Sequence, residues 1–409
     1  MPRLLQINIT ANWGSHGKIA EVLGQTVIKE GWESYIAYGR WYNESKSHLF
    51  HIGNQADEYI HGLASRLLDN QGLMSHAATK RLVKYIETIK PDIIHLHNIH
   101  GYYLNYPILF DYLASSNIPV VWTFHDCWPF TGHCAHYMSA NCEKWMTHCS
   151  NCPLKHAYPE SWLRDRSFQN FEDKQRAFLS VKRLTIVPVS KWLEKDLKRS
   201  FFKNCHIHQI YNGIDTTQFF PENKRDDTLK KYNVPNDKKV ILGVASNWYQ
   251  KGLGDFISLS RLLDDHYIIV LVGLNDRELS DLPQNMIGIK RTDSQAELRS
   301  LYSSSDVYFN PTWVDNFPTT NIEALACGTP IVVYDTGGCA EAVSPMTGYV
   351  VQQGNIKDAV EKIKEICRHP KVQYIEACRS QTLQKYNSEQ QYKKYYDLYA
   401  SILQKTAFD

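Results

Sequence analysis

Two carboxylates frame a short turn in the second half of the chain. Asp315 opens the segment DNFPTTNIE, and Glu323 closes it eight positions later. The turn contains Pro318 and leads into a helical pattern, whose first N–H groups lack partners and therefore suit an anion. The turn suits the phosphates of a ligand, and the two acids suit its hydroxyl groups. This combination predicts a nucleotide-sugar as the ligand. The alternative is an ordinary helix with a charged entry.

A lysine and a histidine follow other predicted strands. Lys251 lies in the loop after the strand Lys239–Ala245, where it could reach a phosphate as a point charge. His125 and Asp126 end a segment whose preceding residues, Pro119–Phe124, read as a buried strand. Ligands of parallel sheets bind at the carboxyl ends of strands, so we predict that this His-Asp pair points into the functional cleft. The alternatives are a solvated lysine and a structural histidine.

Two glycines occupy the turn between the first predicted strand and the first predicted helix. Gly14 and Gly17 would let the backbone approach a diphosphate closely at a helix N-terminus. A steric reason alone is an equally good explanation, because many such turns contain two glycines.

Five of the 10 cysteines lie within one short segment, from Cys127 to Cys152. Their number and the C-x-x-C spacing predict a structural four-thiolate zinc site. Its ligands would be Cys134, Cys142, Cys149 and Cys152. Cys127 directly follows the His-Asp pair and is predicted to lie outside the site. Buried thiols, disulfides or an iron–sulfur cluster are the alternatives, and His133, His136 or His148 could replace one ligand.

Strands that alternate with helical segments predict parallel βαβ units in two sets. The first set contains the predicted strands Leu4–Ile9, Ser34–Tyr38, Asp92–His97, Pro119–Phe124, Thr185–Val189 and Ile207–Tyr211. The second contains Lys239–Ala245, Tyr267–Val272, Val307–Asn310 and Pro330–Tyr334. We therefore expect an α/β protein with two doubly wound domains, residues 1–211 and 212–387, and a terminal helix over 388–409. The cysteine-rich insertion spans about 127–160.

Composition excludes several classes of protein. A formal net charge of +2 over 409 residues gives no reason to expect nucleic acid as a partner. No apolar run approaches the roughly 18 residues that a membrane span needs. The N-terminal sequence lacks the apolar region of a signal peptide, so we expect a cytoplasmic protein. In that reducing compartment, thiols or metal ligands are expected rather than disulfides.

Several blocks along the chain together resemble one enzyme family. They are Gly14–Gly17, Asp92–Asn98, Thr123–Asp126, Val189–Trp192, Asn212–Asp215, Lys251-Gly252, Asp315–Pro330 and Thr336–Glu341. The chain resembles the retaining glycosyltransferases of the GT-B fold, a group that includes bacterial mannosyl- and glucosyltransferases. These enzymes act in exopolysaccharide (colanic-acid-type) and lipopolysaccharide synthesis. The resemblance implies two facing Rossmann-like domains, with the last helix packed on the N-terminal domain.

The resemblance also implies a role for each matching residue. Asp315 would face the donor sugar, His125 would contact that sugar, and Glu323 would hold the ribose hydroxyls. Lys251 would bind the diphosphate. Backbone contacts to the sugar and diphosphate would come from Asn316, Phe317, Pro318 and Thr319. The family usually has Glu at position 315 and commonly has Gly at position 318. No catalytic metal and no protein nucleophile are expected.

The acceptor side carries no family-wide motif. Three segments of the N-terminal domain mix aromatic and basic residues: Ile60–Leu73, His100–Tyr106 and Ala157–Lys182. Such a surface suits contact with a membrane that carries a lipid-linked glycan, and a solvated, partly packed surface is the alternative. The donor would be a UDP-, GDP- or ADP-sugar. A nucleotide-sugar epimerase or hydrolase, and a non-catalytic nucleotide-sugar-binding protein, are the competing functions.

Overall fold

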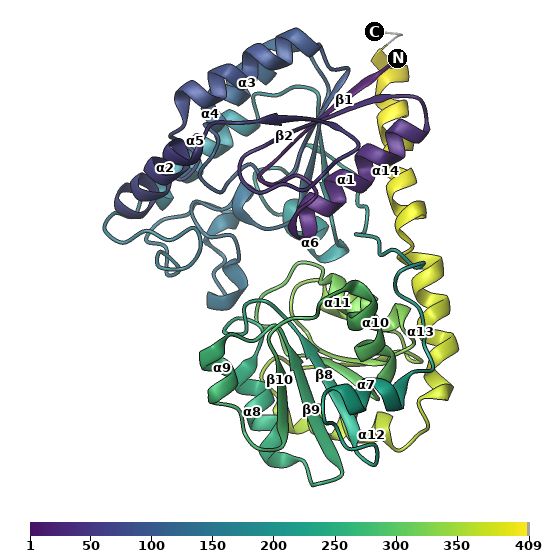
Figure 1. Cartoon of the computed structure of the whole chain (residues 1–409). Coiled ribbons are helices and arrows are strands. Elements are labelled where there is room, and N and C mark those ends of the chain that lie inside the picture. Colours follow the sequence, from purple (N-terminus) through teal and green to yellow (C-terminus); the bar gives the residue numbers. More distant parts are fainter. Residues whose placement is uncertain (407–409) are drawn as a thin grey trace. The chain divides into compact units, whose positions relative to one another are not determined.

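The computed structural model describes residues 1–406 of the chain. It divides into two compact units, which we describe separately. Unit 1 comprises residues 1–211 together with the chain from Tyr392 onward, and unit 2 comprises Asn212–Gln391. Each unit is built on one sheet with helices on its faces (Figure 1). Residues 407–409, the end of the expected terminal helix, lie outside the described range.

Unit 1 contains a seven-stranded parallel sheet with the strand order β3-β2-β1-β4-β5-β6-β7. Its strands are β1 Arg3–Asn8, β2 Glu33–Tyr38, β3 His48–His51, β4 Ile93–Leu96, β5 Val120–Phe124, β6 Leu184–Pro188 and β7 His206–Ile207. Its helices are α1 Gly14–Lys29, α2 Gln55–Leu68, α3 His76–Ile89, α4 Tyr106–Ser116, α5 Ser167–Phe178 and α6 Lys191–Leu197, joined by most of α14 Ser388–Thr406. Three short 3-10 helices, η1 Trp128–Phe130, η2 Tyr137–Ala140 and η3 Lys144–Met146, lie in the cysteine-rich insertion.

Unit 2 contains a six-stranded parallel sheet with the order β10-β9-β8-β11-β12-β13. Its strands are β8 Lys239–Val244, β9 Tyr267–Val272, β10 Met286–Ile289, β11 Val307–Asn310, β12 Ile331–Tyr334 and β13 Gly348–Val351. Its helices are α7 Arg225–Lys231, α8 Leu253–Leu262, α9 Asp276–Ser280, α10 Gln295–Ser304, α11 Thr319–Ala326, α12 Ile356–Cys367 and α13 Val372–Lys385, with the 3-10 helix η4 Cys339–Ala342.

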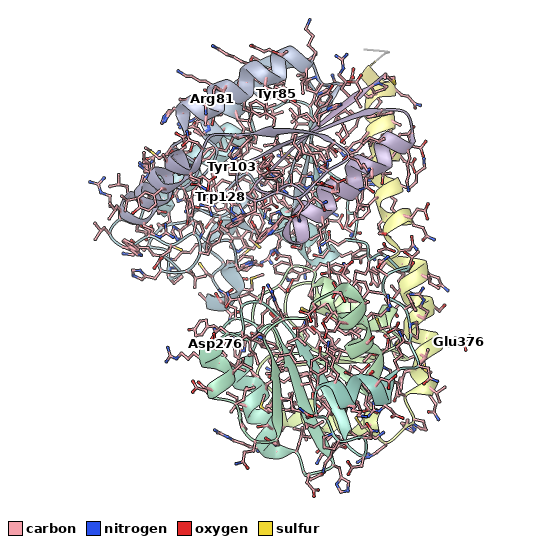
Figure 2. All side chains as sticks on the ribbon, viewed as in Figure 1. Arg81, Tyr85, Tyr103, Trp128, Asp276 and Glu376 are labelled. Atoms are coloured by element: carbon pink, nitrogen blue, oxygen red, sulfur yellow. The ribbon has the colours of Figure 1, made fainter. Side chains whose placement is uncertain are left out.

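The central strands are buried along almost their whole length because helices cover both faces of a parallel sheet. All five residues of β5 are buried, and Tyr103 and Trp128 are 1% and 0% exposed in the same unit. Figure 2 shows these two aromatic side chains in the interior of unit 1, whereas Arg81 on α3 extends outward. The fold-class prediction is confirmed, since both units are parallel α/β structures.

The C-terminal helix completes the core of unit 1. Tyr395 and Tyr399 of α14 are almost fully buried and belong to the same core cluster as Leu4 of β1 and Val121 of β5. The Tyr399 hydroxyl lies 2.6 Å from His95 Nδ1, which anchors the helix to the sheet. Figure 1 shows α14 alongside α1 at the edge of this unit.

Strand positions agree with the sequence patterns to within a residue or two in most cases. One prediction is wrong in extent, because the strand expected at Ile207–Tyr211 ends at Ile207. The sequence patterns missed three strands, which are β3, β10 and β13. All three are only partly buried, unlike the four-residue strands β4, β11 and β12, which are buried throughout, and β3 exposes both of its terminal histidines.

Candidate active site

The strand order of unit 2 reverses between β8 and β11, which are neighbours in the sheet. The loops after two such strands run in opposite directions, and this opens a crevice at the carboxyl ends of the strands. Lys251 lies on the loop after β8, and Asp315 lies on the loop after β11. The Lys251 Nζ atom lies 2.6 Å from Asp315 Oδ2 and also donates to the Val314 carbonyl at 2.9 Å. The topology thus brings together two of the predicted residues, 64 positions apart.

Both carboxylate oxygens of Asp315 are engaged. Oδ2 accepts from Lys251, and Oδ1 accepts from the Phe317 N–H at 3.2 Å. The loop is fixed from behind by Gly337, whose φ of +54° is unfavourable for other residues. A Cβ atom at Gly337 would lie 1.7 Å from the Asp315 carbonyl oxygen. The acid is therefore held in one orientation by its own loop and by a neighbouring backbone.

Helix α11 starts directly after this loop. Pro318 occupies its N-cap position, so the missing N–H of proline precedes the helical N–H groups of Thr319 and Thr320. Glu323 lies on the second turn of α11, and its Oε2 accepts from the Tyr302 hydroxyl at 3.0 Å. Burial and the neighbouring Glu323 raise the pKa of Tyr302 well above its ordinary value. Tyr302 therefore stays a neutral donor to the glutamate.

The side chains of the turn itself are not open to a ligand. Asn316 is 3% exposed and Phe317 is 5% exposed, and Pro318 is also buried. The Phe317 ring packs near the Tyr386 ring, with 5.6 Å between the ring centroids. Only the backbone of these residues, together with Thr319, can contribute to binding.

In unit 1, His125 follows β5 and lies in a chain of polar groups. The Gln6 Nε2 group donates to the Ala20 carbonyl at 2.7 Å, which leaves Gln6 Oε1 to accept from His97 Nε2 at 3.0 Å. A neutral His97 that donates through Nε2 has an unprotonated Nδ1, which can only accept. His97 Nδ1 lies 3.2 Å from His125 Nε2, so the proton of this hydrogen bond belongs to His125 Nε2. Burial, followed by the influence of His97, holds the pKa of His125 well below its ordinary value. The result is a neutral His125 whose Nδ1 is an acceptor.

Asp126, the next residue after His125, makes its hydrogen bonds with other neighbours. Its Oδ2 lies 2.7 Å from His100 Nε2, and its Oδ1 accepts from the Trp128 N–H at 2.9 Å. Burial raises the pKa of Asp126, but the charge and hydrogen bond of His100 outweigh burial and keep that pKa below its ordinary value. Successive residues at the end of the strand point to different neighbours, so Asp126 fixes the loop while His125 joins the histidine chain.

The two predicted glycines begin helix α1 rather than preceding it. Gly14 is the first residue of α1, with φ +66°, and a Cβ atom at this position would have no neighbour within 4 Å. A Cβ at Gly17 would lie 2.5 Å from Thr10 Oγ1. Close packing against Thr10 is therefore sufficient to explain Gly17, and Gly14 supplies the left-handed entry to the helix.

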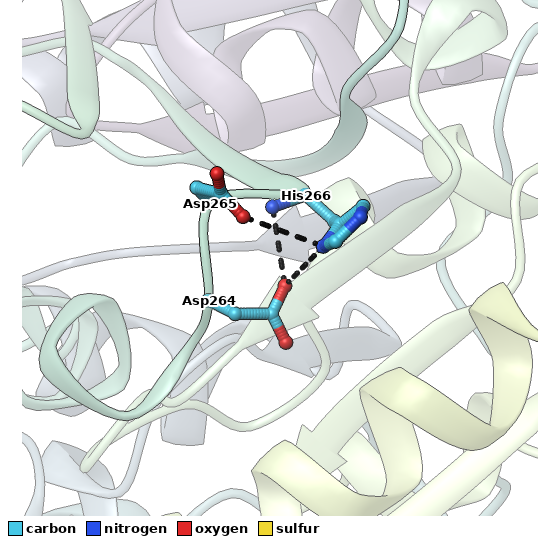
Figure 3. Close-up of side chains that lie close together, drawn as sticks. All are labelled: Asp264, Asp265 and His266. Atoms are coloured by element: carbon cyan, nitrogen blue, oxygen red, sulfur yellow. Dashed lines mark hydrogen bonds and ion pairs between the residues drawn. The ribbon is translucent and has the colours of Figure 1, made fainter.

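The described residues contain one converged group of metal-ligand type. Asp264, Asp265 and His266 are the group of three acids and histidines whose ligand atoms all lie within 4.8 Å, and all three are exposed (Figure 3). They form the turn before β9, at the edge of the sheet opposite Lys251 and Asp315. The His266 N–H donates to Asp264 Oδ1 at 3.1 Å, so the group is a local turn. The four predicted cysteines lie elsewhere, around one small cavity of unit 1.

Sequence reasoning missed the partners of the site. His97 bonds His125, and Tyr302 bonds Glu323. Gln6 in turn bonds His97, and His100 bonds Asp126. A signal was present for His97, which follows β4 as His125 follows β5, and these strands are adjacent. Nothing comparable marked Tyr302, because its contact with Glu323 depends on how α10 packs beside α11.

Two family models match the chain in succession. The model "Glycosyltransferase Family 4" matches residues 19–218, and "Glycosyl transferases group 1" matches residues 224–382. Among curated proteins, the chain is 24% identical over 386 residues to the Escherichia coli K12 protein described as "Putative colanic acid biosynthesis glycosyl transferase WcaC". That match covers 88% of this chain and 90% of the relative.

A second relative matches over a shorter stretch. It is the N,N'-diacetylbacillosaminyl-diphospho-undecaprenol alpha-1,3-N-acetylgalactosaminyltransferase of Campylobacter jejuni, 30% identical over 178 residues. The match covers 42% of this chain and 46% of that enzyme. Both relatives are described as enzymes that transfer a sugar.

Solved structures agree with the fold. Sucrose-phosphate synthase from Thermosynechococcus elongatus superposes with a TM-score of 0.73 at 16% identity, covering 98% of this chain and 99% of that one. Anabaena Alr3699/HepE, solved with UDP-glucose, gives a TM-score of 0.65 at 12% identity, covering 97% and 99%. Taken with the two family models, these matches show that the chain belongs to the glycosyltransferases of group 1 with the GT-B fold and acts in glycan biosynthesis.

Proposed function

We propose that the chain transfers a hexose from a nucleotide-sugar to a hydroxyl group of a glycan, with retention of the anomeric configuration. The observation that carries this proposal is the cation–acid arrangement at the strand-order reversal of unit 2, where Lys251 lies 2.6 Å from Asp315 beside the start of α11. Lys251 binds the diphosphate, Glu323 holds the ribose hydroxyls and Asp315 contacts the transferred sugar. The backbone of Asn316, Phe317 and Thr319 contributes the remaining donor contacts.

The chemistry requires stabilisation of a leaving nucleoside diphosphate. Negative charge develops on its phosphate oxygens, where the Lys251 ammonium and the N-terminal dipole of α11 favour it. In unit 1, we assign His125 to the transferred sugar, and Gly14 and Gly17 to the donor. The leaving phosphate takes the proton of the acceptor, so no protein nucleophile is assigned.

A solved neighbour supports a nucleotide donor. HepE, which shares the fold, was solved with UDP and with UDP-glucose. UDP-, GDP- and ADP-sugars are therefore the donors to compare.

A cavity in unit 1 suits the acceptor. It has a volume of about 470 Å³, and its wall includes Arg40, Tyr59, Arg66 and Trp162. Arg40 pairs with Glu58 at 3.1 Å, which offsets its positive charge. The cavity is therefore lined by aromatic side chains and by charges of both signs. Tyr59 is 74% exposed, and further apolar side chains nearby, Ile60 and Leu163, are also exposed.

We propose a lipid-linked glycan as the acceptor, with this surface at the inner face of the cytoplasmic membrane. The Campylobacter relative is named for a diphospho-undecaprenol substrate, which supports a lipid carrier. Exposed aromatic and aliphatic side chains among arginines suit the headgroup region of a bilayer. None of the described helices combines the length and apolar composition that a membrane span requires.

A two-stage experiment tests the function. Thermal unfolding is first measured with UDP-, GDP- and ADP-sugars, because binding to the native state raises the midpoint. The stabilising donor, labelled in its sugar, is then incubated with a membrane lipid extract. We expect label in the lipid fraction, with the anomeric configuration of the donor preserved. Release of free labelled sugar would instead indicate a hydrolase. An altered sugar on the nucleotide would indicate an epimerase, and stabilisation without turnover would indicate a binding protein.

A further inference from the structure

The cysteine-rich insertion between β5 and α5 has little regular structure. Its elements are three 3-10 helices of three or four residues each. Such short segments contribute few backbone hydrogen bonds, and small irregular regions commonly depend on disulfides or metals for stability. The transfer reaction proposed above uses none of its cysteines.

Four cysteines surround one cavity within this insertion. The cavity has a volume of about 10 Å³, the size of a single water molecule or ion, and its wall includes Cys134, Cys142, Cys149 and Cys152. Cys134 and Cys149 are 5% and 9% exposed, and the other two are half-buried. Cys127 is not part of the wall, and its backbone N–H donates to the Ala135 carbonyl at 2.9 Å.

A buried histidine at the same cavity indicates that a partner belongs there. His133 lies in the cavity wall, and its Nδ1 lies 2.7 Å from Asp69 Oδ1. Its Nε2 is buried without a hydrogen-bond partner among the described residues. The four cysteines line the same cavity, where a metal-bound thiolate would accept a hydrogen bond from that nitrogen.

We propose that Cys134, Cys142, Cys149 and Cys152 bind one Zn²⁺ ion, with His133 and Asp69 bordering it. Four thiolates in a closed site suit zinc in a structural role. Cys134 and Cys152 are close enough for a hydrogen bond, but no three of the four cysteine sulfur atoms lie within 4.8 Å of one another among the described residues. A tetrahedral ion with Zn–S bonds of about 2.3 Å holds sulfurs about 3.8 Å apart, so binding draws the thiols inward.

The ion would fix the loop that follows His125 and Asp126. The Cys134 carbonyl accepts from Thr131 Oγ1 at 2.6 Å, and the Ala135 carbonyl holds Cys127, two residues after His125. Lys174 of α5 donates to the Trp128 and Thr131 carbonyls at 2.8 and 3.1 Å. Zinc would therefore join Cys142, Cys149 and Cys152 to the end of β5 and so hold the candidate sugar-binding histidine in place.

Metal analysis of the purified full chain tests the site. We expect about one zinc per chain, released in step with the modification of four thiols by an organomercurial. Less than about half an equivalent of zinc, bound iron, or a disulfide between these cysteines would overturn the proposal. This arm uses the unaltered protein, so it does not depend on whether a variant folds.

Substitutions then identify the ligands. Cys142→Ser and Cys152→Ser should lose most of the zinc, whereas Cys127→Ser and Cys205→Ser should keep a full equivalent. Cobalt-loaded protein should show the absorption of a tetrahedral thiolate site, and both outcomes are readable without an activity assay. Full zinc in Cys142→Ser together with loss in His133→Ala would make His133 the fourth ligand and contradict the four-cysteine assignment. Failure of the transfer assay would leave these results unaffected.

Discussion

At the scale of single residues, the ion pair of Lys251 and Asp315 is better suited to binding than to stability. The two side chains are 27% and 20% exposed, and pairs of that exposure contribute about 0–1 kcal/mol to folding. Both groups nevertheless point at the end of the sheet where ligands of such folds bind. The pair is therefore expected to matter more for ligand affinity than for the free energy of unfolding.

Lys251→Ala should weaken nucleotide binding by about 10- to 100-fold, because a charge-assisted hydrogen bond contributes about 1.5–3 kcal/mol. Calorimetric titration with the stabilising nucleotide measures the change. Lys364→Ala is the matched control, since Lys364 is 28% exposed and pairs with Asp264 in the turn before β9. If both variants bound the nucleotide with equal affinity, Lys251 would not belong to the phosphate site.

Residue types predicted the candidate residues better than they predicted contacts. Asp315 and Lys251 were identified separately, and the structure joins them in one ion pair. The sequence gives no partner for Asp126, whose carboxylate lies 2.7 Å from His100 Nε2, 26 positions away. Side-chain partners of this kind depend on which loops meet at a sheet edge, and a linear pattern contains no such information.

At the scale of elements, the loop with Asp315 depends on a glycine from the next loop. Gly337→Ala should destabilise unit 2 by about 1–3 kcal/mol, because its Cβ would meet the Asp315 carbonyl oxygen at 1.7 Å. Chemical denaturation monitored by circular dichroism measures this loss, and nucleotide affinity should fall with it.

Gly254→Ala serves as the control for that substitution. Gly254 lies near the start of α8 with nothing within 4 Å of a Cβ position, so alanine should be neutral or stabilising by up to about 1 kcal/mol. If Gly337→Ala retained wild-type stability and affinity, the close approach of the two loops would not be required.

Element prediction succeeded where a strand forms a mostly buried apolar run. The apolar runs of β5 and β9 were recognised because a covered parallel sheet needs continuous apolar strands. The edge strand β3 has the sequence HLFH and an exposed pattern, so neither an apolar run nor alternation marks it. The insertion was recognised only through its cysteines, because its 3-10 helices have no period long enough to read.

At the scale of the whole molecule, five histidines of unit 1 stay neutral near pH 7, and three of them, His61, His95 and His97, are fully buried. Burial lowers the pKa of His16 to about 4 and that of His61 to about 3, and burial holds the pKa values of His95, His97 and His125 well below 6.5. Below pH 6.5 the unfolded chain binds protons at these positions, whereas the folded unit does not. Stability therefore falls as pH falls from about 6.5 toward 4.

Each such histidine costs up to about 1.4 kcal/mol per pH unit in that window, so unit 1 should lose several kcal/mol between pH 7 and pH 5. Urea denaturation at the two pH values, followed by the fluorescence of buried tryptophans, measures the loss. An equal or higher free energy of unfolding at pH 5 would show that these imidazoles are protonated in the native state.

The variant Asp315→Asn shows whether the Asp315 site of unit 2 both binds the donor and acts in transfer. It keeps an oxygen to accept from the Phe317 N–H and removes the charge beside Lys251. Initial rates of acceptor-dependent sugar transfer should fall at least about 100-fold, while affinity for the nucleoside diphosphate stays within about threefold of the wild type. A wild-type rate of transfer in Asp315→Asn would show that Asp315 takes no part in the reaction.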